Sequence, residues 1–112
     1  MDESTRQKID GLVHNHKVVL FMKGTKHFPQ CGFSGAVVQI LNGVGARYET
    51  VNVLADPAIR EGVKEYTQWP TVPQLYIDGK FVGGCDIVRE MHGRGELVPL
   101  LRTAGALADP AS

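Results

Sequence analysis

The spacing of apolar and polar residues changes several times within the first half of the chain. At residues 4–15 the apolar positions follow helical spacing, with Ser4 as the expected N-cap. The continuous apolar run VVLFM at 18–22 predicts a buried strand instead. Polar residues at 23–30 indicate a loop, and a second apolar stripe predicts a helix at 32–41 that stops at an Asn-Gly pair. The chain therefore begins as helix, strand and helix.

The second half supplies the remaining strands. YETVNV at 48–53 alternates and predicts a strand, and an aspartate followed by proline at 56–57 is a typical helix start. The segment QLYIDGKFVGG at 74–84 predicts a hairpin, because its central Asp-Gly pair suits a two-residue type I′ turn. Residues 86–101 contain one or two short helices.

This order of elements restricts the sheet. A β-α-β start implies parallel pairing with a right-handed crossover, and the final hairpin must be antiparallel. We therefore expect an α/β fold with one mixed four-stranded sheet flanked by helices. The 112 residues suffice for a single domain at 1–104, followed by a small, polar tail at 105–112 that we expect to be flexible.

Composition and charge exclude several classes of function. Apolar residues make up 43% of the chain, and 12 basic residues balance 12 acidic ones. We therefore expect a folded globule with no nucleic-acid or membrane partner. No secretory signal is visible at the N-terminus, and two cysteines are too few for a disulfide scaffold. A reducing compartment is expected: the bacterial cytoplasm, or the mitochondrial matrix if a transit peptide has been removed.

The stretch FPQCGFSGAV places Cys31 at the start of a predicted helix. The N–H groups and dipole there favour an anion and lower the pKa of a thiol, and Lys23 would add a positive charge nearby. The alternative is a small apolar cysteine in the core.

Ser34 stands where a Cys-x-x-Cys motif has its second thiol. A hydroxyl cannot resolve a mixed disulfide, so an internal dithiol cycle through this motif is excluded.

Further candidate binding residues lie in the second half. A cis Val72-Pro73 bond would turn the Val72 N–H and C=O toward an extended peptide, whereas the alternative is an ordinary turn proline. Asp86 is the expected N-cap of the next helix, whose exposed N-terminus suits a zwitterionic amino-acid group. By themselves, Cys85 is more typical of a buried structural thiol and Arg60 of a surface charge.

Taken together, four motifs in order resemble those of the monothiol, CGFS-type glutaredoxins, which have the thioredoxin fold. They are Lys23-Gly24-Thr25, Cys31-Gly32-Phe33-Ser34, Trp69-Pro70-Thr71-Val72-Pro73 and Gly83-Gly84-Cys85-Asp86. The resemblance extends from about residue 5 to residue 104. It departs at Lys26, where the family often has proline, and we expect Lys26 to loosen the loop and to add charge near the site.

The resemblance implies a role for each matching residue. Cys31 is implied as the redox thiol and as a ligand of a [2Fe–2S] cluster. The implied glutathione-binding residues are Lys23, Arg60, Val72, Cys85 and Asp86. Lys23 and Arg60 would hold the glycine carboxylate, Val72 the cysteinyl backbone, and Cys85 and Asp86 the γ-glutamyl end.

The number of thiols limits how a cluster could bind. A [2Fe–2S] cluster usually needs four thiolates, and each chain offers one that is exposed. Two chains and two glutathione molecules complete four, which predicts a homodimer when loaded and a monomer when not. The resemblance implies delivery of the cluster to apo iron–sulfur proteins, with a BolA-type protein as partner.

Two other uses of the thiols stay open. The alternative function is a glutathione-dependent thiol-disulfide oxidoreductase that deglutathionylates proteins by a monothiol mechanism. A Cys31–Cys85 disulfide acting as a redox switch is a third reading, which the sequence does not decide.

Overall fold

The structure, a computed structural model, describes residues 1–107. The elements are α1 (Glu3–Asn15), β1 (Val18–Met22), α2 (Gly32–Gly43), β2 (Glu49–Asn52), η1 (Val53–Ala55, a 3₁₀ turn), α3 (Pro57–Thr67), β3 (Gln74–Ile77), β4 (Lys80–Gly83), α4 (Cys85–Gly93) and α5 (Leu97–Thr103). The order is the one expected from the sequence, with two short helices at the C-terminal end. None of these helices is long and apolar enough to cross a membrane.

The four strands form one mixed sheet in the order β2-β1-β3-β4. β1 pairs parallel with β2 and antiparallel with β3, and β3 and β4 form the expected hairpin. Both residues of its turn, Asp78 and Gly79, have positive φ angles of 54° and 76°, as a type I′ turn requires. The predicted mixed four-stranded sheet is therefore confirmed.

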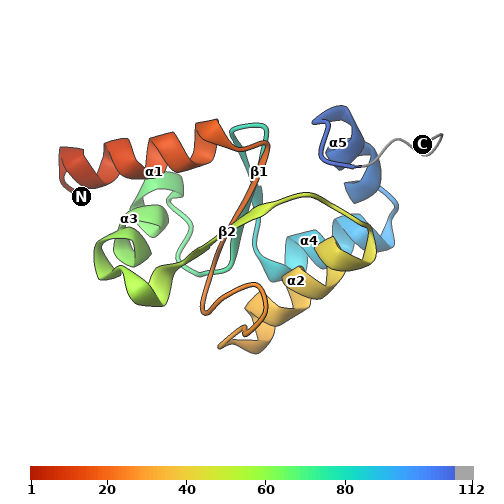
Figure 1. The fold of residues 1–112 in the computed structure, drawn as a ribbon, viewed down its shortest axis with the longest axis horizontal. Coiled ribbons are helices and arrows are strands. Elements are labelled where there is room, and N and C mark those ends of the chain that lie inside the picture. The colour runs from red at the N-terminus through yellow and green to blue at the C-terminus, as the bar shows by residue number, and fades with distance from the viewer. Residues whose placement is uncertain (108–112) are drawn as a thin grey trace.

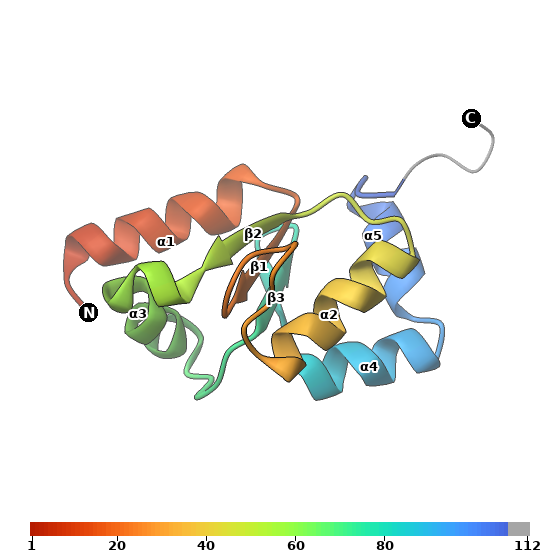
Figure 2. The ribbon, with the colours of Figure 1, turned by 60° about the horizontal axis from the view of Figure 1, so that its bottom comes forward.

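Helices cover both faces of this sheet. Figures 1 and 2 show α1 and α3 on one side and α2, α4 and α5 on the other. Side chains of β1 alternate between two cores: Val18, Leu20 and Met22 pack toward α2, α4 and α5, whereas Val19 and Phe21 pack toward α1 and α3. Because both faces of β1 are buried, its sequence is a continuous apolar run.

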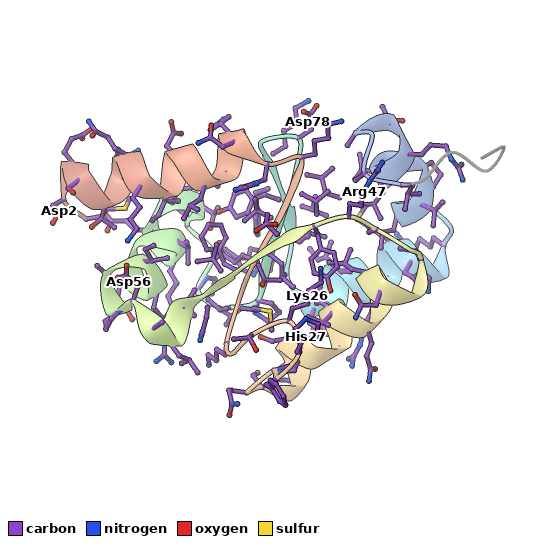
Figure 3. The ribbon with its side chains drawn as sticks, in the orientation of Figure 1. Asp2, Lys26, His27, Arg47, Asp56 and Asp78 are labelled. Carbon is purple, nitrogen blue, oxygen red and sulfur yellow. The ribbon has the colours of Figure 1, made fainter. Side chains whose placement is uncertain are left out.

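Aspartates cap the two helices on the α1–α3 side of the sheet (Figure 3). The carboxylate of Asp2 accepts a hydrogen bond from the N–H of Thr5 at 2.8 Å, so the prediction of Ser4 as the cap is wrong. Ser4 lies inside the first turn, because the helix begins two residues earlier than a cap at Ser4 implies. At α3 the expected start is confirmed, since Asp56 accepts from the N–H of Ile59 at 3.3 Å.

β2 is shorter than the predicted strand at 48–53 because Asn52 ends it. Its side-chain oxygen accepts from the N–H of Leu54 at 3.0 Å, which turns the chain into η1. The same oxygen accepts from the N–H of Gly24 at 3.0 Å. Asn52 thereby joins the end of β2 to the loop that follows β1.

Residues 105–107, which the sequence places in the tail, pack on the domain. Ala106 is buried, and its carbonyl accepts from the N–H of Arg47 at 2.8 Å. The Arg47 guanidinium donates to the carbonyls of Gly105 and Leu107 (Figure 3). Packing therefore continues past the boundary expected at residue 104. The rest of the predicted tail, residues 108–112, lies outside the described residues.

Candidate functional site

A cavity of about 480 Å³ lies where the end of β1 meets the N-termini of α2 and α4. Its wall includes every residue for which the sequence predicts a site role: Lys23, Cys31, Arg60, Val72, Cys85 and Asp86. These residues come from four separate segments of the chain. The fold therefore brings the whole predicted set to one place.

Cys31 is the N-cap residue of α2 and is partly exposed, so it is not a core cysteine. The backbone N–H of Ser34 is the main cause that lowers the pKa of the Cys31 thiol, and it outweighs the opposing effect of burial. The N–H of Phe33 and the charge of Lys23 lower this pKa further. At neutral pH a larger fraction of Cys31 is therefore thiolate than in an ordinary cysteine.

Cys85, the other cysteine, has the opposite character. Its side chain is buried, and burial is the main cause that raises the pKa of its thiol. Both Cys31 and Cys85 are free thiols in the structure. The structure thus places two free thiols along the same cavity, and their pKa values are shifted in opposite directions.

The N-cap of α4 is Gly84, so the prediction of Asp86 as the cap is wrong. The helix begins at Cys85, so Asp86 lies inside its first turn and Gly84 precedes it. A Cβ at position 84 would lie 3.2 Å from the carbonyl oxygen of Pro73 and 3.3 Å from the indole nitrogen of Trp69, which leaves little room for a capping side chain. Without a side-chain cap, the first N–H groups of α4 stay available to a ligand, and the exposed carboxylate of Asp86 lies in the same turn.

The main chain of Val72 provides a further pair of polar groups. The Val72–Pro73 peptide bond is cis, so of the two alternatives that the sequence left open, a cis bond or an ordinary turn proline, the first is present. The side chain of Val72 is buried in the core beneath α1 and α3. Within residues 1–107 its N–H and carbonyl have no hydrogen-bond partner. An extended backbone bound in the cavity would find one donor and one acceptor here.

Three cationic side chains line the cavity: Lys23, Arg60 and Lys64. Within the described residues, the Nε of Arg60 is buried and lacks a hydrogen-bond partner. Lys64, which also contacts Glu61 at 3.3 Å, was missed in the sequence analysis. Its position one helical turn after Arg60 is the signal that could have found it. These cations make the α3 side of the cavity suitable for a carboxylate.

The loop at 23–30 brings Cys31 to the cavity in a fixed conformation. The N–H of Gln30 donates to the carbonyl of Lys23 at 2.9 Å, which closes the loop. Gly24 has a φ of 92°, and a Cβ there would lie 2.5 Å from the backbone nitrogen of Gln30. Only glycine fits at this point of the loop.

Lys26, in the same loop, does not line the cavity. Its Nζ lies 4.0 Å from the centroid of the Tyr48 ring and 3.5 Å from the Tyr48 carbonyl oxygen. The expectations that Lys26 loosens the loop and adds charge near the site are therefore wrong. A cation–π contact of about 0.5–1 kcal/mol holds the loop to the start of β2.

The chain by itself offers few metal ligands near Cys31. Within residues 1–107 no group of three or more His, Cys, Asp or Glu side chains could hold a metal ion. A metal bound by the Cys31 thiolate would therefore need ligands from outside this chain.

Comparisons with known proteins agree with this geometry. Residues 18–82 match the family model described as Glutaredoxin. The "Uncharacterized monothiol glutaredoxin ycf64-like" of Synechocystis is 56% identical over 104 residues, which cover 93% of this chain and 97% of that relative. The crystal structure of a buckwheat glutaredoxin-glutathione complex has a TM-score of 0.85 at 36% identity, covering 95% of this chain and 94% of that one. Reduced poplar apo GrxS14 is 56% identical with a TM-score of 0.78, covering 88% of this chain and 91% of that one.

Proposed function

This chain belongs to the monothiol glutaredoxin family and has its thioredoxin-like fold, and we propose that it binds glutathione in the cavity beside Cys31. The observation that carries the proposal is the convergence on one cavity of a thiol with a lowered pKa, a buried unpartnered guanidinium nitrogen and an uncapped helix N-terminus. The cavity volume of about 480 Å³ is in the range typical of small-molecule sites. The structure of the buckwheat complex with glutathione supports the same ligand.

Each part of glutathione has a complementary group in this cavity. Lys23 and Arg60 would hold the glycine carboxylate, with Lys64 as a third cation. The free N–H and C=O of Val72 would pair with the cysteinyl backbone, which directs the glutathione sulfur toward Cys31. The N–H groups at the start of α4 would bind the γ-glutamyl carboxylate, and the Asp86 carboxylate its ammonium group.

We further propose that the protein carries a [2Fe–2S] cluster as cargo. Cys31 is the better ligand of the two cysteines, because the pKa of its thiol is lowered, whereas Cys85 is buried and the pKa of its thiol is raised. Two copies of Cys31 and the sulfurs of two glutathione molecules would supply the four ligands that such a cluster needs. The loaded form is then a homodimer and the unloaded form a monomer. Because half of its ligands are small molecules, the cluster is exchangeable and suited to delivery.

The recipients of the cluster would be apo iron–sulfur proteins, and a BolA-type protein would be a binding partner, as in the family that the motifs resemble. The place of action would be a reducing compartment, the bacterial cytoplasm or the mitochondrial matrix, where Cys31 stays reduced.

Anaerobic reconstitution with iron, sulfide and glutathione tests cluster binding. We expect a coloured dimer, identified by its absorption spectrum and its mass, that does not form when glutathione is omitted. Cys31→Ser should abolish the colour, whereas Cys85→Ala, which keeps the backbone N–H of α4, should retain it. A colourless monomer from the unmodified protein under these conditions would contradict the proposal.

A second candidate function is deglutathionylation, which the lowered pKa of the Cys31 thiol favours. The Cys31 thiolate attacks the glutathione sulfur of a protein–glutathione mixed disulfide, forms a Cys31–glutathione disulfide and releases the protein thiolate. A second glutathione thiolate then attacks the glutathione sulfur of this intermediate, which releases the Cys31 thiolate and glutathione disulfide. No thiol at position 34 is needed.

Turnover of a glutathione mixed disulfide separates the two functions. We expect weak turnover beside efficient cluster loading. Turnover equal to that of a dithiol glutaredoxin, together with failed reconstitution, would favour the enzyme.

A further inference from the structure

Ser34 is completely buried, although it lies one helical turn from the partly exposed thiol of Cys31. Its hydroxyl accepts a hydrogen bond from the N–H of Lys23 at 3.1 Å. This N–H belongs to the first residue after β1, where the regular pairing of the strand has ended. The hydroxyl thus satisfies a part-buried main-chain donor and joins the end of β1 to the first turn of α2.

A second hydrogen bond acts on the other side of Lys23. Its carbonyl accepts from the N–H of Gln30 at 2.9 Å. Lys23 is therefore held through its N–H by Ser34 and through its carbonyl by Gln30. These two residues stand on either side of Cys31 in the sequence. If the hydroxyl of Ser34 is removed, one of the two attachments between Lys23 and the Cys31 segment is lost.

We propose that Ser34 is a positioning residue whose hydroxyl holds Lys23 against the start of α2, so that the Lys23 side chain lines the ligand cavity together with Cys31. The part of this inference that concerns the ligand depends on the proposed binding of glutathione. In a dithiol motif the equivalent sulfur would be a weaker acceptor for the same N–H. The serine of the motif therefore has a function of its own besides the absence of a resolving thiol.

A double-mutant cycle on reduced glutathione binding tests whether Ser34 acts through Lys23. We expect Ser34→Ala to weaken binding about three- to tenfold, the usual effect of one lost hydrogen bond. Combined with Lys23→Gln, it should add little further loss, because both changes remove the same contribution. Ser34→Thr keeps the hydroxyl and should restore binding. Additive losses, or a Ser34→Thr protein as weak as Ser34→Ala, would overturn the proposal.

The control variant is Gly35→Ala, on the same helical turn. Its added methyl group meets only Pro29, at 3.6 Å, and removes no hydrogen bond. We expect it to bind glutathione as the unmodified protein does. An equal loss in this control would show that any change in this turn disturbs the site, which contradicts a specific function of the hydroxyl.

Amide hydrogen exchange at Lys23 tests the inference without glutathione. We expect faster exchange at this amide in Ser34→Ala and normal exchange in Ser34→Thr. If the unmodified protein does not bind glutathione, the proposed function fails while this measurement still decides on Ser34. Unchanged exchange in a folded Ser34→Ala protein would overturn the inference. If Ser34→Ala does not fold, Ser34→Cys, a slightly larger residue with a weaker acceptor, replaces it in both measurements, which are then made with a reductant so that no disulfide forms with Cys31.

Discussion

Cys31 and Cys85 line the same cavity from the N-termini of two helices, yet the pKa values of their thiols are shifted in opposite directions. Backbone N–H groups favour the thiolate of Cys31, whereas burial disfavours that of Cys85. We expect iodoacetamide to modify Cys31 several times faster than Cys85 near neutral pH, because the thiolate is the reactive form. Peptide mapping by mass spectrometry measures the two rates.

The matched control for this experiment is Cys31→Ser, in which the slow labelling of Cys85 should persist unchanged. Equal labelling rates in the unmodified protein would contradict the assignment. The same mass measurement, made after mild oxidation and alkylation of the remaining thiols, decides whether Cys31 and Cys85 form a disulfide.

Lys64 lines the cavity one turn from Arg60, and its charge should contribute to the binding of a carboxylate. We expect Lys64→Gln to weaken glutathione binding about two- to fivefold, the effect of one partly exposed ion pair, and to reduce the dependence of binding on salt. Titration calorimetry at two ionic strengths measures both. Lys80→Gln removes an exposed lysine outside the cavity and should have no effect. Equal losses from both variants would indicate only a change in overall charge.

Gly24 is the residue of the loop where a side chain is least tolerated. In Gly24→Ala the methyl group would lie 2.5 Å from the nitrogen of Gln30 and 2.6 Å from the carbonyl oxygen of Phe28, at a φ of 92°. We expect a loss of about 2 kcal/mol or more in the free energy of unfolding, measured with denaturant. Gly43→Ala, which meets no atom within 4 Å, is the control and should not destabilise the protein. Equal stability of the two variants would show that the loop relaxes freely.

Asp56 links the stability of the fold to pH. The hydrogen bond from Lys8, at 3.0 Å, and then that from the N–H of Ile59 lower the pKa of its carboxyl group. A lowered folded-state pKa stabilises the protein above the ordinary carboxyl pKa, and this stabilisation disappears as the pH falls through the lowered value. We expect Asp56→Asn to be less stable at neutral pH and the difference to shrink in acid. Denaturant unfolding over a pH series measures it, and a difference independent of pH would contradict the ionic contribution.

Much of the fold follows from local patterns in the sequence. The apolar run of β1, the Asp56 cap and the Asp-Gly turn each depend on residues that are close together in the chain. Two local predictions were wrong because each helix begins two residues earlier than the expected cap implies. The first helix begins at Glu3 with Asp2 as its cap, and α4 begins at Cys85 with Gly84 as its cap, so Ser4 and Asp86 both lie inside a first turn.

The sequence by itself determined the order of elements and predicted Cys31 as the reactive cysteine. Helical period, strand period and caps act over a few residues, and the motifs resemble one known family. Only the tertiary structure decided that Lys64 lines the cavity, that Lys26 packs on Tyr48, and that the Ser34 hydroxyl holds Lys23. These contacts join segments that are far apart in the chain. They therefore depend on how the helices pack on the sheet, which no local pattern records.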